Sequence, residues 1–149
     1  MALDASFIGH CYPAAATYQV GREKIREFAD AIGDGNAVCR DPGAARAVGY
    51  ADVVAPPTFA MILALRAQEE LINDPKLGLD YRRMVHGSQS FTHHRPIKAG
   101  DELAAALYVD GIRTVGGNDM LTLRCEIIDG AGDPVTTARA VLVVRGTDP

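Results

Sequence analysis

Hydrophobic residues in the first part of the chain recur with the period of a helix. Between positions 22 and 32 they fall at intervals of three and four, and charged side chains occupy the opposite side. This spacing predicts an amphipathic helix over Arg22–Ile32 that ends at Gly33. Asp41 followed by proline is typical of a helix cap and first turn, so a second, short helix is predicted over Pro42–Val48.

A third helix is expected to be the buried one. Two prolines and Thr58, as its N-cap, precede the segment Phe59–Leu65, which is apolar on every side. A helix that is apolar all round is expected to be enclosed by other elements. Polar residues dominate from Arg66 to Glu70, so the helix is expected to enter solvent before Pro75 ends it.

The second half has the pattern of strands joined by turns. Apolar and polar residues alternate, and segments rich in Gly, Asn and Asp separate four runs, which predicts an antiparallel meander. The predicted strands are Arg83–Arg95, Glu102–Val115, Met120–Asp129 and Val135–Arg145. Because helices and strands occupy separate parts of the chain, the fold class is α+β. The sheet is expected to wrap around the long buried helix as a single hotdog domain spanning residues 1–149.

Composition excludes several classes of function. The chain has 15 Lys and Arg against 19 Asp and Glu, a net charge of -4 that disfavours binding to phosphate backbones, so no nucleic-acid partner is expected. The longest apolar run, Phe59–Leu65, is far shorter than the roughly 20 residues of a spanning helix. The N-terminus also lacks the pattern of a secretory signal. We therefore expect a cytoplasmic protein without a membrane partner.

Cysteine and histidine positions do not suggest a metal site. The three cysteines are widely and irregularly spaced, so reduced thiols are expected. On a regular strand His93 and His94 point to opposite faces, and His86 and His94 share a face at a separation of about 26 Å. Histidine ligands must converge on one ion at about 2 Å. We expect no metal and no cofactor.

Six segments, in order along the chain, resemble the motifs of MaoC-like hotdog proteins. They are Phe28–Ala37, Asp41–Ala45, Gly49–Tyr50, Val54–Thr58, Val85–Phe91 and Arg95–Asp101. The combination is similar to the N-terminal type of MaoC dehydratase domain, found in (3R)-hydroxyacyl-ACP dehydratases of type II fatty-acid synthesis, and it extends from about Phe7 to Val144. The resemblance implies a dehydratase or hydratase of acyl thioesters.

The sequence departs from this family at one important position. Active members have Gly-Asp-x-Asn-Pro-x-His, whose Asp and His form the catalytic dyad, whereas this chain has Asp34 but Cys39 at the histidine position. Dehydration needs proton transfer at C2 and at the departing hydroxyl, and a thiol with a pKa near about 8.5 does this poorly at neutral pH. Each residue also has a purely structural interpretation. Asp34 is as well explained as a turn residue after a helix as by a catalytic role, and Cys39 is explained as a small apolar side chain in a packed loop.

The resemblance also implies where a thioester binds. In hotdog enzymes a backbone N–H at the start of the buried helix holds the thioester carbonyl; Pro57 has none, so Thr58 or Phe59 would serve, and the acyl chain would pass Met61. Further substrate-binding candidates are Asn36, His86, Gly87 and Gln89, and the basic residues Arg82, Arg83, Arg95 and Lys98 are candidates for CoA phosphates or an acidic carrier protein. Polar residues on a sheet and a solvated basic edge are the alternative readings.

The leading hypothesis is a dehydratase subunit that binds an acyl-CoA or acyl-ACP thioester and pairs with a second hotdog subunit that carries an intact Asp and His. The alternatives are a self-sufficient homodimeric hydratase, a non-catalytic acyl-thioester-binding protein and a thioesterase, because a fold alone does not fix the reaction. Acyl-chain length and the choice between a homodimer and a heterodimer stay open at this point.

Overall fold

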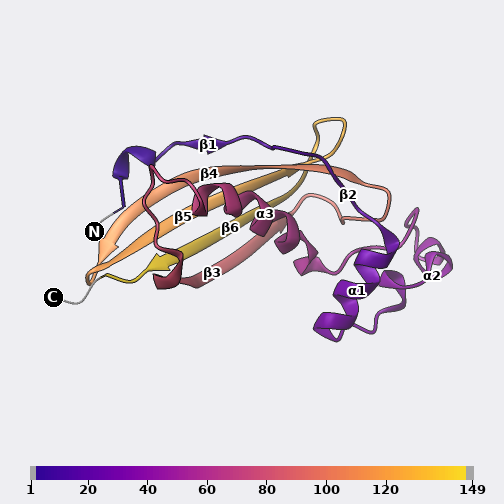
Figure 1. Cartoon of the computed structure of the whole chain (residues 1–149). Coiled ribbons are helices and arrows are strands. Elements are labelled where there is room, and N and C mark those ends of the chain that lie inside the picture. Colours follow the sequence, from indigo (N-terminus) through magenta and orange to yellow (C-terminus); the bar gives the residue numbers. More distant parts are fainter. Residues whose placement is uncertain (1–2, 147–149) are drawn as a thin grey trace.

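The computed structural model describes residues 3–146 as one antiparallel sheet with three α-helices and four short 3₁₀ helices. The helices are α1 (Arg22–Ile32), α2 (Pro42–Ala47) and α3 (Met61–Ile72), and the 3₁₀ helices are Ala5–Phe7, Ala37–Cys39, Pro57–Ala60 and Tyr81–Arg83. The strands are β1 (Cys11–Tyr12), β2 (Tyr18–Gln19), β3 (Met84–His93), β4 (Glu102–Val115), β5 (Asn118–Ile128) and β6 (Pro134–Val144). Figure 1 shows α3 lying along one face of the curved sheet, with α1 and α2 near one end.

The first two helices begin and end where the local chemistry predicts. Gly33 follows α1 with a φ of 72°, a left-handed conformation that suits glycine and closes the helix. Asp41 caps α2 by accepting a hydrogen bond from the N–H of Gly43. The α2 helix ends at Ala47, one residue before the predicted end. Both predicted helices are therefore confirmed.

The four predicted strands are present, with ends within two residues of the expected positions, and the α+β class is confirmed. The order in the sheet is β1-β4-β5-β6-β3, and β2 also pairs with β4. Because β3 pairs with β6 and not with β4, the expectation of one meander through all four strands is wrong. The segment from His94 to Asp101 instead carries the chain across the sheet, and within residues 3–146 β3 has a strand neighbour on one side only.

The long helix α3 is buried along one face and not at one end. Leu63 and Leu71, near its two ends, are 2% and 0% exposed, and Gln68 is 2% exposed, so the expectation that the second half enters solvent is wrong. The helix lies against the sheet for its whole length, and burial therefore follows its period. On the opposite side Leu65 is 49% exposed, which leaves one flank of the apolar helix uncovered. No helix within residues 3–146 has the length and apolar content to cross a membrane.

Candidate active site

A pocket of about 470 Å³ lies where the loop after α1 meets the end of β3 and the segment before α3. Its polar lining consists of Asp34, Asn36, Cys39, His93, His94 and Arg95, and its apolar lining includes Val38, Val54, Ala55, Pro56, Pro57 and Ile97. Mostly apolar walls with a few polar groups, at this volume, are typical of small-molecule sites. The fold thus brings the motif residues Asp34, Asn36 and Cys39 into one pocket.

The side chains of Asp34 and Asn36 hold the loop that they belong to. Asp34 Oδ1 accepts a hydrogen bond from the N–H of Asn36 at 3.0 Å, and Asn36 Oδ1 accepts one from the N–H of Val38 at 3.2 Å. The second bond caps the 3₁₀ helix Ala37–Cys39. The turn interpretation of Asp34 is therefore supported, although the second carboxylate oxygen makes no hydrogen bond within the described part of the chain.

Cys39 is a buried thiol, with 4% of its surface exposed. Burial raises the pKa of Cys39 above its ordinary value, and the negative charge of Asp34 raises this pKa further, against an opposing effect of Arg40. The thiol is consequently neutral at physiological pH. It is poorly suited to accept a proton from a substrate, and its surroundings agree with the interpretation of a small packed side chain.

A bulge in β3 decides which face of the sheet His93 occupies. The pairing of β3 with β6 shifts between His86 and Ser88, so Gly87 is an extra residue and the alternation of faces changes there. His86, Gln89 and His93 consequently share a face, and the expectation that His86 and His94 do so is wrong. His93 was missed as a site residue by sequence reasoning. The signal that points to it is a glycine inside a strand, which often marks a bulge.

The other β3 candidates lie at the far end of the strand, away from this pocket. His86 Nε2 is 3.1 Å from Gln89 Oε1, and both side chains are on the face that α3 covers in part. His86 lines a separate groove of about 1050 Å³ between α3 and β3, lined also by Leu65, Gln68, Glu69, Ile72, Asn73, Leu79, Tyr81, Arg82 and Met84. We call this the α3–β3 groove. A Cβ on Gly87 would lie 3.0 Å from the carbonyl oxygen of Val141, so close packing accounts for the glycine.

The segment before α3 offers one free backbone donor. Thr58 lies inside the 3₁₀ helix Pro57–Ala60 and makes no capping bond, so the prediction of Thr58 as an N-cap is wrong; the prolines start a 3₁₀ turn that runs directly into α3. The Phe59 N–H donates to the carbonyl of Pro56 at 2.9 Å, and the Phe59 side chain is fully buried. The Thr58 N–H has no acceptor among residues 3–146. Met61 is half-buried beside this segment.

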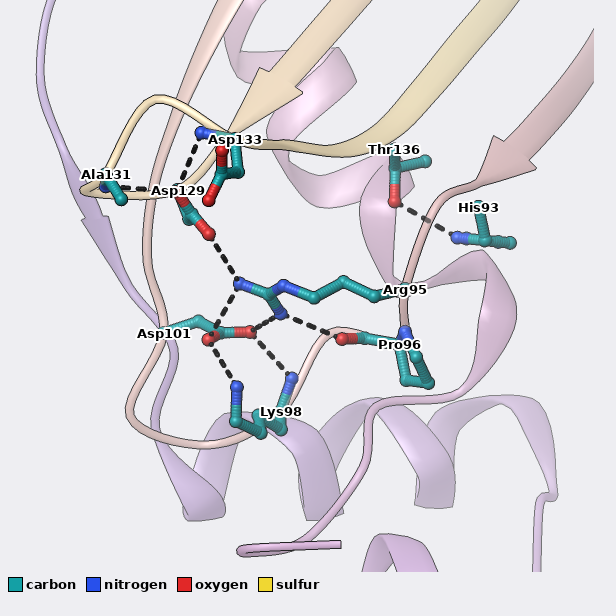
Figure 2. A network of polar contacts seen from close by, with 9 residues as sticks. All are labelled: His93, Arg95, Pro96, Lys98, Asp101, Asp129, Ala131, Asp133 and Thr136. Atoms are coloured by element: carbon teal, nitrogen blue, oxygen red, sulfur yellow. Dashed lines mark hydrogen bonds and ion pairs between the residues drawn. The ribbon is translucent and has the colours of Figure 1, made fainter.

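The basic residues considered for phosphate binding are already engaged. Arg95 donates to both carboxylate oxygens of Asp101, at 2.8 and 3.2 Å, and lies 3.4 Å from Asp129. Figure 2 shows the guanidinium of Arg95 between these two carboxylates, with Lys98 on the far side of Asp101. Arg82 pairs with Asp80, and Arg83 donates to backbone carbonyls near the C-terminus. Their roles are therefore at least partly structural.

Sets of three or more His, Cys, Asp and Glu side chains arranged to hold a metal ion do not occur within residues 3–146. The polar groups that line the pocket include a carboxylate, an amide, a thiol, two imidazoles and a guanidinium.

Known proteins resemble this chain over nearly its whole length. A family model described as the dehydratase domain region of FAS1-like proteins matches residues 6–138. A UPF0336 protein of Saccharopolyspora erythraea is 57% identical over 147 residues, which cover 99% of this chain and 94% of that protein. A solved MaoC-like dehydratase superposes with a TM-score of 0.88 at 35% identity over 96% of this chain, which spans only 43% of that longer protein. The C-terminally truncated HadBC (3R-hydroxyacyl-ACP dehydratase) complex from Mycobacterium tuberculosis superposes with a TM-score of 0.87 at 29% identity, covering 96% of this chain and 99% of that one.

Proposed function

The chain belongs to the MaoC-like hotdog family of FAS1-like dehydratase domains, and from this premise we propose that it is the acyl-binding subunit of a (3R)-hydroxyacyl thioester dehydratase of fatty-acid metabolism. The substrate is an acyl-ACP or acyl-CoA thioester. In this proposal residues 1–149 act as one hotdog domain, and a second hotdog subunit supplies the Asp and His that transfer protons.

One observation carries this proposal: the pocket is formed, but a buried neutral thiol, Cys39, stands where the dyad needs an imidazole. General acid–base help of this kind is worth about 10²–10⁴-fold in rate. The Asp34 carboxylate that remains is committed in part to its own turn. Substrate binding can persist in such a site when the proton transfers are carried out elsewhere.

Two uncovered surfaces support association with a second hotdog. The β3 strand has unpaired backbone groups on one side within residues 3–146, and such an edge is a template for pairing with another chain. The uncovered flank of α3, with Leu65 at 49% exposure, adjoins this edge through the α3–β3 groove. Two of the similar proteins agree with this, since one is a two-subunit dehydratase complex and the other is more than twice the length of this chain.

The thioester is expected to bind with its carbonyl near the start of α3. The N–H of Thr58 is the free donor there, whereas the N–H of Phe59 is already bonded. The acyl chain would run along the uncovered flank of α3 past Met61 and Leu65 into the α3–β3 groove, whose volume of about 1050 Å³ suits an extended chain. Asn36 in the pocket and His86 in the α3–β3 groove remain substrate-contact candidates, together with Gly87 and Gln89 beside His86 on β3.

The test is hydration of a trans-2-enoyl thioester by the purified chain, alone and co-expressed with a hotdog chain that contains Gly-Asp-x-Asn-Pro-x-His. We expect little turnover by the chain alone and rapid turnover by the pair. In the pair, Asp34→Asn should change the rate by less than about threefold, whereas the same substitution in the partner's motif should lower it about 10²–10⁴-fold. Ordinary enzymatic turnover by the chain alone would refute the subunit assignment.

The alternative is a self-sufficient homodimeric hydratase, and one observation favours it: His93 lies in the same pocket as Asp34. In that case the chain alone turns over, and both His93→Phe and Asp34→Asn abolish activity.

A further inference from the structure

His93 is held in a defined orientation at the wall of the pocket. Its Nδ1 lies 3.0 Å from Thr136 Oγ1, and the ring stacks on Phe91 with centroids 5.9 Å apart and planes 16° from parallel. Figure 2 shows the His93 ring turned toward Thr136 and away from the Arg95 network. The histidine side chain therefore has one nitrogen engaged by the protein and the other available to the pocket.

The burial of Thr136 determines where the proton of His93 lies. Thr136 is 0% exposed, and its hydroxyl has no hydrogen-bond partner except His93 Nδ1 within residues 3–146. If the Thr136 hydroxyl donates to Nδ1, both groups are satisfied; if Nδ1 donates instead, a buried hydroxyl hydrogen is left without an acceptor, which is unfavourable. In the satisfied arrangement the uncharged form of the His93 ring carries its proton on Nε2.

Of the other two basic side chains of the pocket, Arg95 is engaged and His94 is held only by a longer contact. The Arg95 guanidinium is engaged by Asp101 and Asp129, and His94 Nε2 lies 3.4 Å from Thr137 Oγ1. His93 Nε2 makes no hydrogen bond in the described part of the chain, so its N–H is free to meet a ligand. An N–H donor held in one orientation at a pocket with largely apolar lining suits an uncharged oxygen acceptor.

We propose that the Nε2–H of His93 donates a hydrogen bond to the carbonyl oxygen of an acyl thioester bound in this pocket, with Thr136 as the positioning residue that fixes the tautomer. The inference rests on the proposed function, because it takes the thioester as the ligand. It assigns binding to a residue on β3 that lies outside the Asp34–Cys39 motif. The pocket is also lined by Pro57, the residue before the free N–H of Thr58.

The test compares two ligands that differ at the carbonyl alone. Calorimetry on the purified full chain measures binding of hexanoyl-CoA, a thioester, and of S-hexyl-CoA, the thioether that lacks the oxygen. His93→Phe should weaken binding of the thioester about 5- to 10-fold, the loss expected for one neutral hydrogen bond, and should leave the thioether unchanged. His93→Gln, whose amide nitrogen can occupy the place of Nε2, should retain most of the affinity for the thioester. Circular dichroism confirms the fold of each variant.

The role of Thr136 has a separate readout. Imidazole NMR shifts of the wild type should report the Nε2–H tautomer, and Thr136→Val should give a mixture of tautomers together with a smaller, about 2- to 5-fold, loss of thioester affinity. Equal weakening of both ligands by His93→Phe, or an Nδ1–H tautomer in the wild type, would overturn the inference and leave the proposed function intact. Failure of the wild type to bind either CoA ligand would count against the proposed function itself, and it would also refute the inference, which depends on that function.

Discussion

Replacing Asp101 by Asn should destabilise the protein through the ion-pair network that secures one wall of the pocket. Asp101 is 8% exposed and accepts bonds from both guanidinium NH groups of Arg95, and also from the backbone N–H of Lys98 at 2.9 Å and its Nζ at 3.1 Å. In Asp101→Asn the side chain keeps its size but loses its charge. One of its two acceptor atoms becomes an NH₂ group, which faces the donors of Arg95 or Lys98.

The size of the effect follows from burial and from the alternatives left to Arg95. Removing one partner of a fully buried pair costs about 3–5 kcal/mol, and a hydrogen bond to a charged group contributes about 1.5–3 kcal/mol. The Arg95 side chain is 30% exposed and keeps a contact of 3.4 Å with Asp129, so solvent and this carboxylate offset part of the loss. We expect a decrease of about 2–3 kcal/mol in the free energy of unfolding, which for a chain of this length lowers Tm by roughly 5–10 °C.

Urea unfolding followed by circular dichroism measures this change, with Asp133→Asn as the matched control. Asp133 lies in the neighbouring turn of Figure 2, is exposed, and makes no side-chain hydrogen bond within residues 3–146, so its loss should change stability by less than about 0.5 kcal/mol. A double-mutant cycle that combines Asp101→Asn with Arg95→Ala should give a coupling free energy of about 1–2 kcal/mol between the two side chains. Equal stability of Asp101→Asn and the control would refute the reasoning.

The same network sets a pH dependence. Burial by itself would raise the pKa of Asp101, but the hydrogen bonds from Arg95 and Lys98 outweigh it and hold this pKa below its ordinary value. A lowered carboxyl pKa stabilises the folded state above the pKa of the unfolded chain, about 3.9, and this stabilisation disappears as the pH falls through the folded pKa. The difference in stability between wild type and Asp101→Asn should therefore be constant above about pH 5 and shrink below about pH 4.

Three further predictions concern association, the acyl chain and the bulge. Light scattering of the purified chain should give at least a dimer, because one flank of α3 is uncovered, and a stable monomer of 15.9 kDa would contradict this. Met61→Trp, or Leu65→Trp at the α3–β3 groove, should weaken binding of a thioester with about twelve acyl carbons more than that of acetyl-CoA; equal effects on both would place the acyl chain elsewhere. Gly87→Ala should cost about 1 kcal/mol because its Cβ would meet the Val141 carbonyl at 3.0 Å, whereas Gly111→Ala, whose nearest contact would be 3.7 Å, should cost less than about 0.5 kcal/mol.

Elements that depend on local chemistry could be predicted from the sequence. The spacing of apolar residues and the Asp41 cap define α1 and α2, and the glycines at 116 and 117, both with positive φ, form the turn between β4 and β5. These features need no knowledge of distant residues, since the period and the turn chemistry act within one segment. The two-residue strands β1 and β2 are too short to show a period, and they were missed.

Features that depend on contacts between distant segments could not be predicted in the same way. The pairing of β3 with β6 joins segments about 50 residues apart, and the apolar alternation of β3 is compatible with either neighbour. The orientation of His93 depends on one extra residue at Gly87, because a bulge reverses which side chains face α3. Counting along an ideal strand therefore placed His86 with His94, whereas His86 shares its face with His93, which was missed as a pocket residue.

The candidate site shows why a sequence motif can be retained in a chain that lacks the catalytic function for which the motif is known. Asp34 and Asn36 each accept a backbone hydrogen bond within their own loop, and Gly33 closes α1, so these residues are needed for the fold whether or not the pocket transfers protons. A histidine at position 39 would have no structural role comparable to those of Asp34 and Asn36, and the buried thiol of Cys39 packs well there. Selection on folding alone can retain Gly-Asp-x-Asn while the histidine is lost. The presence of Asp34 is therefore weak evidence for catalysis. The structural and catalytic roles are separated by the hydration rate of the two-subunit complex that carries Asp34→Asn, compared with the rate of the complex that carries the same substitution in the partner's motif.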